Sequence, residues 1–179
     1  MDKLTFLRAA NLSPATADRW WPHVDAALFE FGILQPQRVA AWIAQVGHES
    51  EGFVHTREIW GPTKAQVGYE GREDLGNIRP GDGKRFMGRG LIQITGRENY
   101  RRCGEALGFD LVANPVLLES DLLAARSAAW FWYSRGLNAL ADNGDFIALT
   151  KRINGGTNGL ADRQRRWEIA KQYLTTGKP

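Results

Sequence analysis

The sequence has little cysteine and no long apolar run. Cys103 is the single cysteine in 179 residues, which excludes an internal disulfide and is typical of a reducing compartment. No apolar run approaches the ~20 residues that a membrane-spanning helix needs. Residues 1–8 contain Asp2, Lys3 and Arg8 and so have no apolar core of signal-peptide length. We therefore expect synthesis in the cytosol, no stable membrane insertion and outside help for any work beyond the membrane.

Motifs for nucleic-acid binding are also missing. Lys and Arg number 23 against 20 Asp and Glu, with a net charge of +3 and a pI near 9.2. The basic residues are scattered, apart from a group around Arg165, and no zinc finger, RNP motif or recognition helix is present. The mild positive excess favours an anionic partner such as a bacterial envelope, and we expect no nucleic-acid partner.

Motifs for metal binding and for covalent catalysis are missing as well. His48-Glu49 begins like a zinc metalloprotease motif, but the fourth position after His48 is Gly52 rather than a second histidine. Ser50 and Cys103 lack the nucleophile elbow or triad pattern of hydrolases that form covalent intermediates. The sequence therefore predicts no metal and no cofactor.

What is present describes an ordinary globular protein. Hydrophobic residues make up 43% and charged residues 24%, which is typical of a folded domain. We expect one mainly α-helical domain over residues 1–179, with little or no β structure and without a separate wall-binding domain. Apolar spacing and capping residues predict helices over residues 2–10, 14–31, 37–51, 97–107, 121–135, 145–153 and 161–174.

Between the third and fourth predicted helices the helical periodicity disappears. Residues 56–84 are rich in Gly and Pro, and a loop this long inside a domain is usually functional, although a mobile surface excursion is an equal alternative. Residues 86–96 are punctuated by Gly88 and Gly90 and predict extended or turning chain packed closely against other backbone.

The end of the helix predicted over residues 37–51 carries the first candidate for catalysis. At about 100° per residue, Glu49 projects beside Trp42 on the flank of the apolar stripe, whereas Glu51 faces solvent. A carboxyl against an aromatic wall is poorly solvated and keeps its proton, as a general acid requires. The plainer alternative is a helix-end residue paired with an arginine.

A glycosidase needs a second carboxylate across a cleft. Five acidic residues follow in or near the loop, and the nearest is Glu58; the others are Glu70, Glu73, Asp74 and Asp82. An inverting enzyme places its two carboxyl groups about 6.5–9.5 Å apart to leave room for a water molecule. Sequence spacing does not establish that distance.

Several motifs occur together in a fixed order, from about residue 20 to residue 173. The motifs are His48-Glu49-Ser50, residues 81–97 with Asn99-Tyr100, Asn114-Pro115, Trp130-Phe131-Trp132, and Ile153-Asn154-Gly155-Gly156 with Asp162-Arg163. Together they resemble glycoside hydrolase family 19, the chitinase-like enzymes, and in particular its bacteriophage and prophage endolysins.

The resemblance implies a lysozyme-like, two-lobed helical fold and inverting cleavage of β-1,4 bonds next to N-acetylated amino sugars. Under it, Glu49 matches the general acid and Glu58 the general base. Thr95 matches the hydroxyl residue that helps the base to hold the attacking water. Substrate-binding positions are matched by Gln93, Asn154, Tyr100 and Arg163, and Arg163 is also the match for the arginine that neutralises carboxylates beneath the cleft.

Two departures from the family pattern affect the site. The loop after Phe53 is short, so the cleft is expected to be open and Glu58 could be displaced. Plant members carry a glutamate near the position of Asn158, which belongs to a charge triad with the acid and Arg163. The environment of Glu49 must therefore differ from that of the plant enzymes.

These observations predict an endolysin that cleaves the glycan strands of peptidoglycan and lyses the host. The alternatives are a chitinase on the same scaffold, a lytic transglycosylase with one glutamate, and a non-catalytic sugar-binding module or inhibitor. We expect a monomer that is made in the host cytoplasm and reaches the periplasmic wall through a holin.

Overall fold

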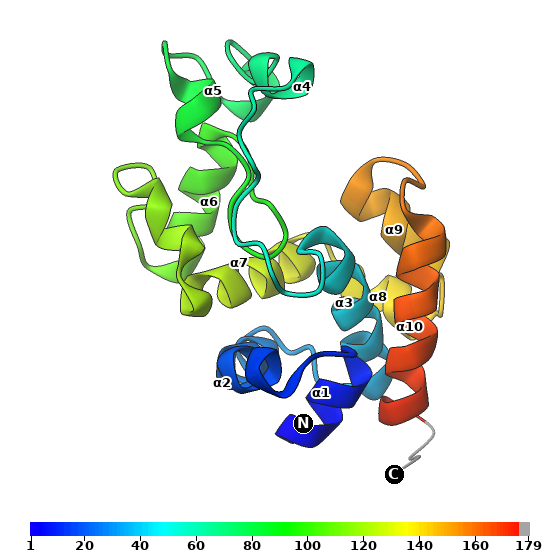
Figure 1. The fold of residues 1–179 in the computed structure, drawn as a ribbon. Helices are drawn as coiled ribbons and strands as arrows, with labels where there is room; N and C mark the ends of the chain where they lie inside the picture. The colour runs from blue at the N-terminus through cyan, green and yellow to red at the C-terminus, as the bar shows by residue number, and fades with distance from the viewer. Residues whose placement is uncertain (176–179) are drawn as a thin grey trace.

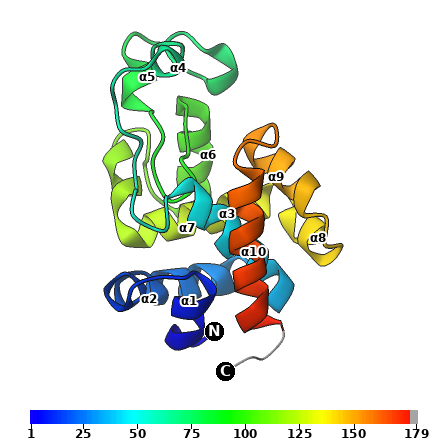
Figure 2. The same ribbon diagram turned by 45° about the vertical axis from the view of Figure 1, so that its right-hand side comes forward.

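The computed structural model describes residues 1–175, which form helices joined by turns (Figure 1). In both views α4, α5 and α6 form one lobe and α8, α9 and α10 the other, with α3 and α7 between them (Figures 1 and 2). The elements are α1 (Lys3–Ala9), α2 (Pro14–Glu30), α3 (Pro36–Glu49), α4 (Lys64–Val67), η1 (Glu73–Leu75), α5 (Asp82–Arg85), α6 (Arg97–Leu107), η2 (Pro115–Glu119), α7 (Asp121–Ser134), α8 (Leu137–Asp142), α9 (Phe146–Asn154) and α10 (Leu160–Leu174).

The expected fold class is confirmed. Within residues 1–175 the β pairing is limited to two isolated bridges, from Arg89 to Arg57 and to Ile94. Both bridges lie in the glycine-punctuated segment that was expected to be extended. None of the helices in this part of the chain is long and apolar enough to cross a membrane.

The core lies between the two central helices and their neighbours. Every residue of α3 from Val39 to Gly47 is buried, and α10 packs along α3 while α7 packs against α2. Trp20, Trp42 and Trp132 are buried in this core. Burying one large aromatic side chain contributes roughly 1.5–3 kcal/mol. The helix α3, which ends at Glu49, is therefore among the best-anchored elements.

The predicted helix ends agree with the structure because capping residues mark them. The Ser13 hydroxyl accepts a hydrogen bond from the Thr16 amide at 3.2 Å, and Pro14 occupies the first helical position. Gly108 and Gly155 follow α6 and α9 with φ of 79° and 74°, the left-handed conformation that ends many helices.

Short elements were missed by the sequence patterns. Residues 56–84 contain α4, η1 and α5, and η2 and α8 lie in segments assigned to no helix. A helix of four residues is too short to show an apolar period. A local signal for α4 exists, since Thr63 and Gln66 form a capping box.

Candidate active site

Two adjoining cavities of about 410 and 300 Å³ share Glu49 and Gln93 in their walls. The larger is lined also by Thr95 and Asn154, and the smaller by Glu58. These volumes fall in the range of ligand sites in proteins. Glu49 therefore lies at the junction of a continuous cleft between the two lobes.

Glu49 is held in place by the turn that follows it. Glu49 ends α3, and Glu51, Gly52 and Phe53 come next with φ of 51°, 78° and 66°. The Phe53 ring is buried against Phe6, and the Phe53 carbonyl accepts a hydrogen bond from Trp20 Nε1 at 2.8 Å. Burial of Phe53 thus offsets the cost of a left-handed conformation that such a residue rarely adopts.

A buried polar network lies beneath Glu49. Arg163, on α10, is 2% exposed and donates to Glu49 Oε1 at 2.5 Å and to Gln45 Oε1 at 2.6 Å. Gln45 Nε2 donates in turn to the Thr150 hydroxyl at 2.8 Å. Arg163 Nε donates to the Asn158 carbonyl at 3.2 Å, so a backbone oxygen is its third partner. Arg163 therefore lies under the cleft and is covered from solvent.

The surroundings of Glu49 differ from the expected aromatic wall. Trp42 lies in the core against Phe53 and lines neither cavity. The aromatic residues that share the larger cavity with Glu49 are Tyr69, Trp130 and Phe131. Glu49 Oε2 makes no hydrogen bond within residues 1–175, which leaves this oxygen available to a substrate.

Glu58 is anchored from both sides although its loop is short. The Gly88 amide donates to Glu58 Oε1 at 2.6 Å, and Gln66 Nε2 donates to Glu58 Oε2 at 3.0 Å. The Glu58 amide also donates to the Gly88 carbonyl at 3.0 Å. Burial, and then the negative charge of Glu58, raise the pKa of Tyr69. The second carboxylate is thus fixed at the cleft.

The other candidate bases have structural partners elsewhere. Glu70 accepts from the Gly81 and Gly83 amides at 2.6 and 2.8 Å, Asp82 pairs with Arg97, and Asp74 pairs with Arg72. Glu73 is exposed and lines neither cavity.

A further acidic residue, Glu51, reaches the smaller cavity, but its side chain is 77% exposed and lies 3.4 Å from His55. Glu58 is therefore the constrained carboxylate that shares a cavity with Glu49.

Gln93 and Asn154 line the larger cavity, and each has one polar atom without a partner. Gln93 Oε1 and Asn154 Nδ2 are buried without a hydrogen-bond partner in the described chain. Buried polar atoms are nearly always bonded, so rotation of these side chains toward the cavity would bring a free acceptor and a free donor to a ligand with both kinds of group. The N-acetylated sugars implied by the sequence carry such groups.

Thr95 lies close to the segment that binds Glu58. A Cβ atom on Gly88 would come within 2.7 Å of Gln93 Oε1 and 3.3 Å of Thr95 Oγ1. The absence of a side chain at Gly88 thus allows its amide to reach Glu58 while Thr95 and Gln93 pack beside it. The Thr95 hydroxyl donates to the Gln93 carbonyl at 3.0 Å.

The expected sugar contact of Tyr100 is wrong. Its side chain is 0% exposed and lines neither cavity, and its hydroxyl donates to the Met87 carbonyl at 2.6 Å and accepts from Arg89 at 3.0 Å. Tyr100 supports the segment that carries Gly88 from behind. Arg163, also counted among the substrate-binding positions, acts through Glu49 because only 2% of it is exposed.

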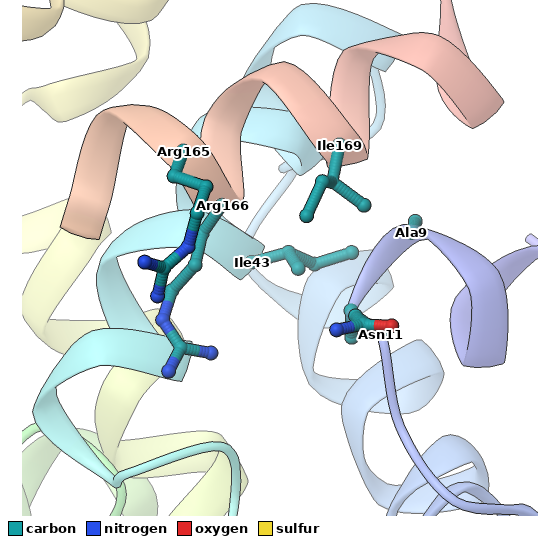
Figure 3. Close-up of a pocket in the computed structure, with 7 residues that line it drawn as sticks. Ala9, Asn11, Ile43, Arg165, Arg166 and Ile169 are labelled. Atoms are coloured by element: carbon teal, nitrogen blue, oxygen red, sulfur yellow. The ribbon is translucent and has the colours of Figure 1, made fainter. Parts of the chain in front are cut away.

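A separate small pocket of about 70 Å³ lies between α10, α3 and the end of α1 (Figure 3). Ile43 and Ile169 form its apolar side, and Arg165 and Arg166 its polar side. Both arginines pair with Asp162. The pocket is far below the ~300 Å³ at which ligand sites begin, and we assign it no function.

Several residues of the site were not identified from the sequence. Gln66, which holds Glu58, could have been found from the capping box, which marks a structured loop. Phe131 belongs to an apolar helix, yet it is half-buried and lines the cleft with Arg135 and Asn99. No local signal distinguishes a cleft aromatic from a core aromatic, because both lie on apolar helix faces.

Comparison with known proteins agrees with this geometry. The family model for class I chitinases of glycoside hydrolase family 19 matches residues 34–145. A family 19 domain-containing protein of Haemophilus influenzae is 30% identical over 85% of this chain and 92% of its own length. An endochitinase of Arabidopsis thaliana is 36% identical over 70% of this chain, which spans 42% of that protein.

The fold has a solved counterpart as well. The crystal structure of chitinase C from Streptomyces griseus matches with a TM-score of 0.77 and 25% identity, over 98% of this chain and 76% of that one. The ordered motifs, the two-lobed helical fold and the cleft with its two carboxylates thus have one explanation: this chain belongs to glycoside hydrolase family 19, the chitinase-like glycosidases.

Proposed function

We propose that this glycoside hydrolase is an endolysin that cleaves the β-1,4 bonds of bacterial peptidoglycan with inversion of configuration. The observation that carries the proposal is the sharing of one cavity by Glu49 and Glu58, which come from different elements and are each anchored through at least one oxygen. An inverting glycosidase needs two such carboxyl groups with room for water.

The roles follow from the surroundings of each carboxyl group. Oε1 of Glu49 is occupied by Arg163, so Oε2 is the atom that carries the proton to the leaving glycosidic oxygen. Glu58, held by Gly88 and Gln66, accepts a proton from the water that attacks the opposite face of the sugar. Thr95 orients that water. Each acid or base contributes typically ~10²–10⁴-fold to such a rate.

Membership of the family does not by itself decide between peptidoglycan and chitin as the substrate. Chitinases are the relatives and the solved neighbours that match, and a chitinase on this scaffold is the second candidate. The positive net charge and the arginine of the larger cavity support an anionic polymer such as peptidoglycan, since chitin is neutral.

The test compares purified Gram-negative sacculi with colloidal chitin and identifies the products by mass spectrometry. We expect muropeptides with a hydrolysed reducing end, whose terminal sugar identifies the bond that is cut. Activity on chitin alone would overturn the proposed substrate, and a 1,6-anhydro product would indicate a lytic transglycosylase. If neither substrate is cleaved, the non-catalytic sugar-binding module is the alternative that remains.

Variants test the two roles. Glu49→Gln and Glu58→Gln should each abolish release of reducing sugar while far-UV circular dichroism stays unchanged. Glu105→Gln, at an exposed carboxylate of α6 that lines neither cavity, is the matched control and should keep full activity. If Glu70→Gln or Glu73→Gln abolishes activity and Glu58→Gln does not, Glu58 is not the base.

We extend the proposal to the setting of the reaction. The enzyme is a monomer, is made in the host cytoplasm, and meets the periplasmic wall after a holin opens the inner membrane. Expression in a Gram-negative host should cause no lysis until the membrane is permeabilised, and sedimentation should give the mass of one chain. Lysis without permeabilisation would contradict the need for a holin, and a dimer would contradict the monomeric state.

A further inference from the structure

Arg135 lies at the larger cavity without a carboxylate partner. It follows α7 and lines the cavity, and within residues 1–175 its side chain forms no ion pair and no hydrogen bond. Arg102 on α6 and Arg152 on α9 are exposed, and neither forms an ion pair in that part of the chain. Burial, followed by the positive charges of Arg102 and Arg152, lowers the pKa of Arg135.

The arrangement is unfavourable for the isolated protein. The Arg135 guanidinium is partly buried, and Arg102 and Arg152, on α6 and α9, add further positive charge to its surroundings. Elsewhere the helix arginines Arg19, Arg38 and Arg126 each bind a carboxylate with two nitrogens. A cation that is partly buried without a partner costs stability, so a ligand with negative charge would relieve it.

Arg135 is oriented for such a ligand. Its guanidinium carbon lies 3.8 Å from the centre of the Phe131 ring, so the plane of the group is supported on one side. No protein acceptor in the described chain binds its N–H groups. A guanidinium binds a carboxylate with two parallel hydrogen bonds, and the supported plane leaves its edge available for that geometry.

We infer that Arg135 binds a carboxylate carried by the glycan chain and so selects anionic strands over neutral ones. The inference rests on the proposed function, because peptidoglycan is the β-1,4 glycan that carries carboxylates here. Arg135 and the two catalytic carboxylates share one cleft, since Glu49 lines one cavity with Arg135 and the adjoining cavity with Glu58. The bound anion would therefore lie within a few sugars of the scissile bond.

Two parts of the wall could supply this carboxylate. In intact strands the stem peptides carry it, whereas strands stripped of peptide by an amidase expose the lactyl carboxylate of the muramic sugar. Both offer the same chemistry to a guanidinium. The experiment therefore uses soluble intact strands and stripped strands, each also in a form whose carboxylates have been converted to amides with carbodiimide and ammonia.

The readout is the ratio of kcat/KM on charged strands to kcat/KM on the amidated form of the same strands. We expect the unmodified enzyme to prefer charged strands by about tenfold, the scale of one charge-assisted hydrogen bond. Arg135→Gln should reduce the ratio toward one, and Arg135→Lys, which keeps the charge but loses the pair of parallel donors, should retain only part of the preference. Arg8→Gln, an exposed and unpaired arginine on α1, removes the same charge far from the cleft and should leave the ratio unchanged.

The outcomes separate the inference from the function on which it rests. A preference seen with intact strands alone assigns the carboxylate to the peptide, and one seen with stripped strands alone assigns it to the lactyl group. Equal rates on charged and amidated strands would overturn the inference while the proposed function stands. If Arg8→Gln lowers the ratio as much as Arg135→Gln does, the preference depends on net charge alone, and the inference is overturned as well. If neither form is cut, the proposed function itself fails.

Discussion

Two buried side chains hold the carboxylates that we propose as acid and base, and each leads to a prediction at the scale of one residue. Arg163 bonds Glu49 and Gln45 from below, and Gln66 bonds Glu58 from the side. Both are almost fully buried. Their effect on catalysis therefore comes through position, because a displacement of 1 Å can cost about 10²-fold in rate.

Arg163→Met should destabilise the protein and abolish activity. The substitution leaves Gln45 Oε1, at a residue that is 0% exposed, without its donor, at a cost of about 1–3 kcal/mol. A change of this size lowers the Tm by roughly 2–10 °C for a chain of this length. Calorimetry measures it, with Arg165→Met on the same helix, 69% exposed, as control. A variant as stable as the control would contradict the prediction.

Gln66→Leu should lower kcat by roughly 10–100-fold. Its amide oxygen accepts from the Gly61 and Thr63 amides, and its nitrogen donates to Glu58 and to the Ile59 carbonyl. Loss of these bonds frees the carboxylate of Glu58, so kcat should fall more than KM rises. Gln37→Leu, at an exposed glutamine in the first turn of α3, is the control. A change in KM alone would assign Gln66 to substrate binding.

At the scale of the elements, the junction of α3 and α10 carries the site. His48 Nδ1 lies 2.8 Å from Asp162 Oδ2, Arg166 Nε donates to the same oxygen at 2.8 Å, and Arg165 also pairs with Asp162. Asp162 thus connects the helix that ends at Glu49 with the helix that supplies Arg163.

The junction should weaken in acid. Burial acts to raise the pKa of Asp162, but hydrogen bonds from Arg166 and His48 outweigh it and lower the pKa from 3.8 to about 2. Because the folded-state pKa is the lower one, the stabilisation is complete above about pH 4 and is lost as the pH falls toward about 2.

The measurement is the free energy of unfolding of the unmodified protein and of Asp162→Asn across that pH range. The difference between the two should shrink as the pH falls from about 4 to about 2. Glu73→Gln, at an exposed carboxylate outside the junction, is the control. A difference that stays constant with pH would show that Asp162 contributes nothing to folding through its charge.

At the scale of the whole molecule, one core connects the elements of both lobes. Residues from α1 to α10 contribute to a single buried cluster, which includes Cys103 of α6. Cys103 is 0% exposed, and burial raises the pKa of its thiol to about 12. The reactivity of this thiol therefore reports whether the lobe that contains α6 opens separately or together with the rest of the protein.

We expect Cys103 to react with a thiol reagent only as fast as the protein unfolds. At pH 8 the buried thiol should be inert in the native protein and should react completely in denaturant, with the same midpoint as circular dichroism. Cys103→Ala provides the blank. Reaction in the native state well below that midpoint would indicate that the α6 lobe opens on its own.

The amino-acid sequence by itself determined the helices, their ends and the family. Apolar spacing and caps are local signals, so α2, α3, α6, α7, α9 and α10 were predictable within a few residues, and the ordered motifs placed Glu49 at a helix end. The four-residue helices α4 and α5 were not predictable, because they are too short to show a period.

Only the tertiary structure decided which side chains meet. Arg163 and Glu49 are separated by 114 residues, and Glu58 and Gly88 by 30. It also buried Tyr100, which its motif had placed at the sugar, and placed Arg135 in the wall of the cavity that Glu49 lines. The physical reason is that a periodic pattern reports which face of a helix is buried, whereas partners across a cleft depend on how separate helices pack.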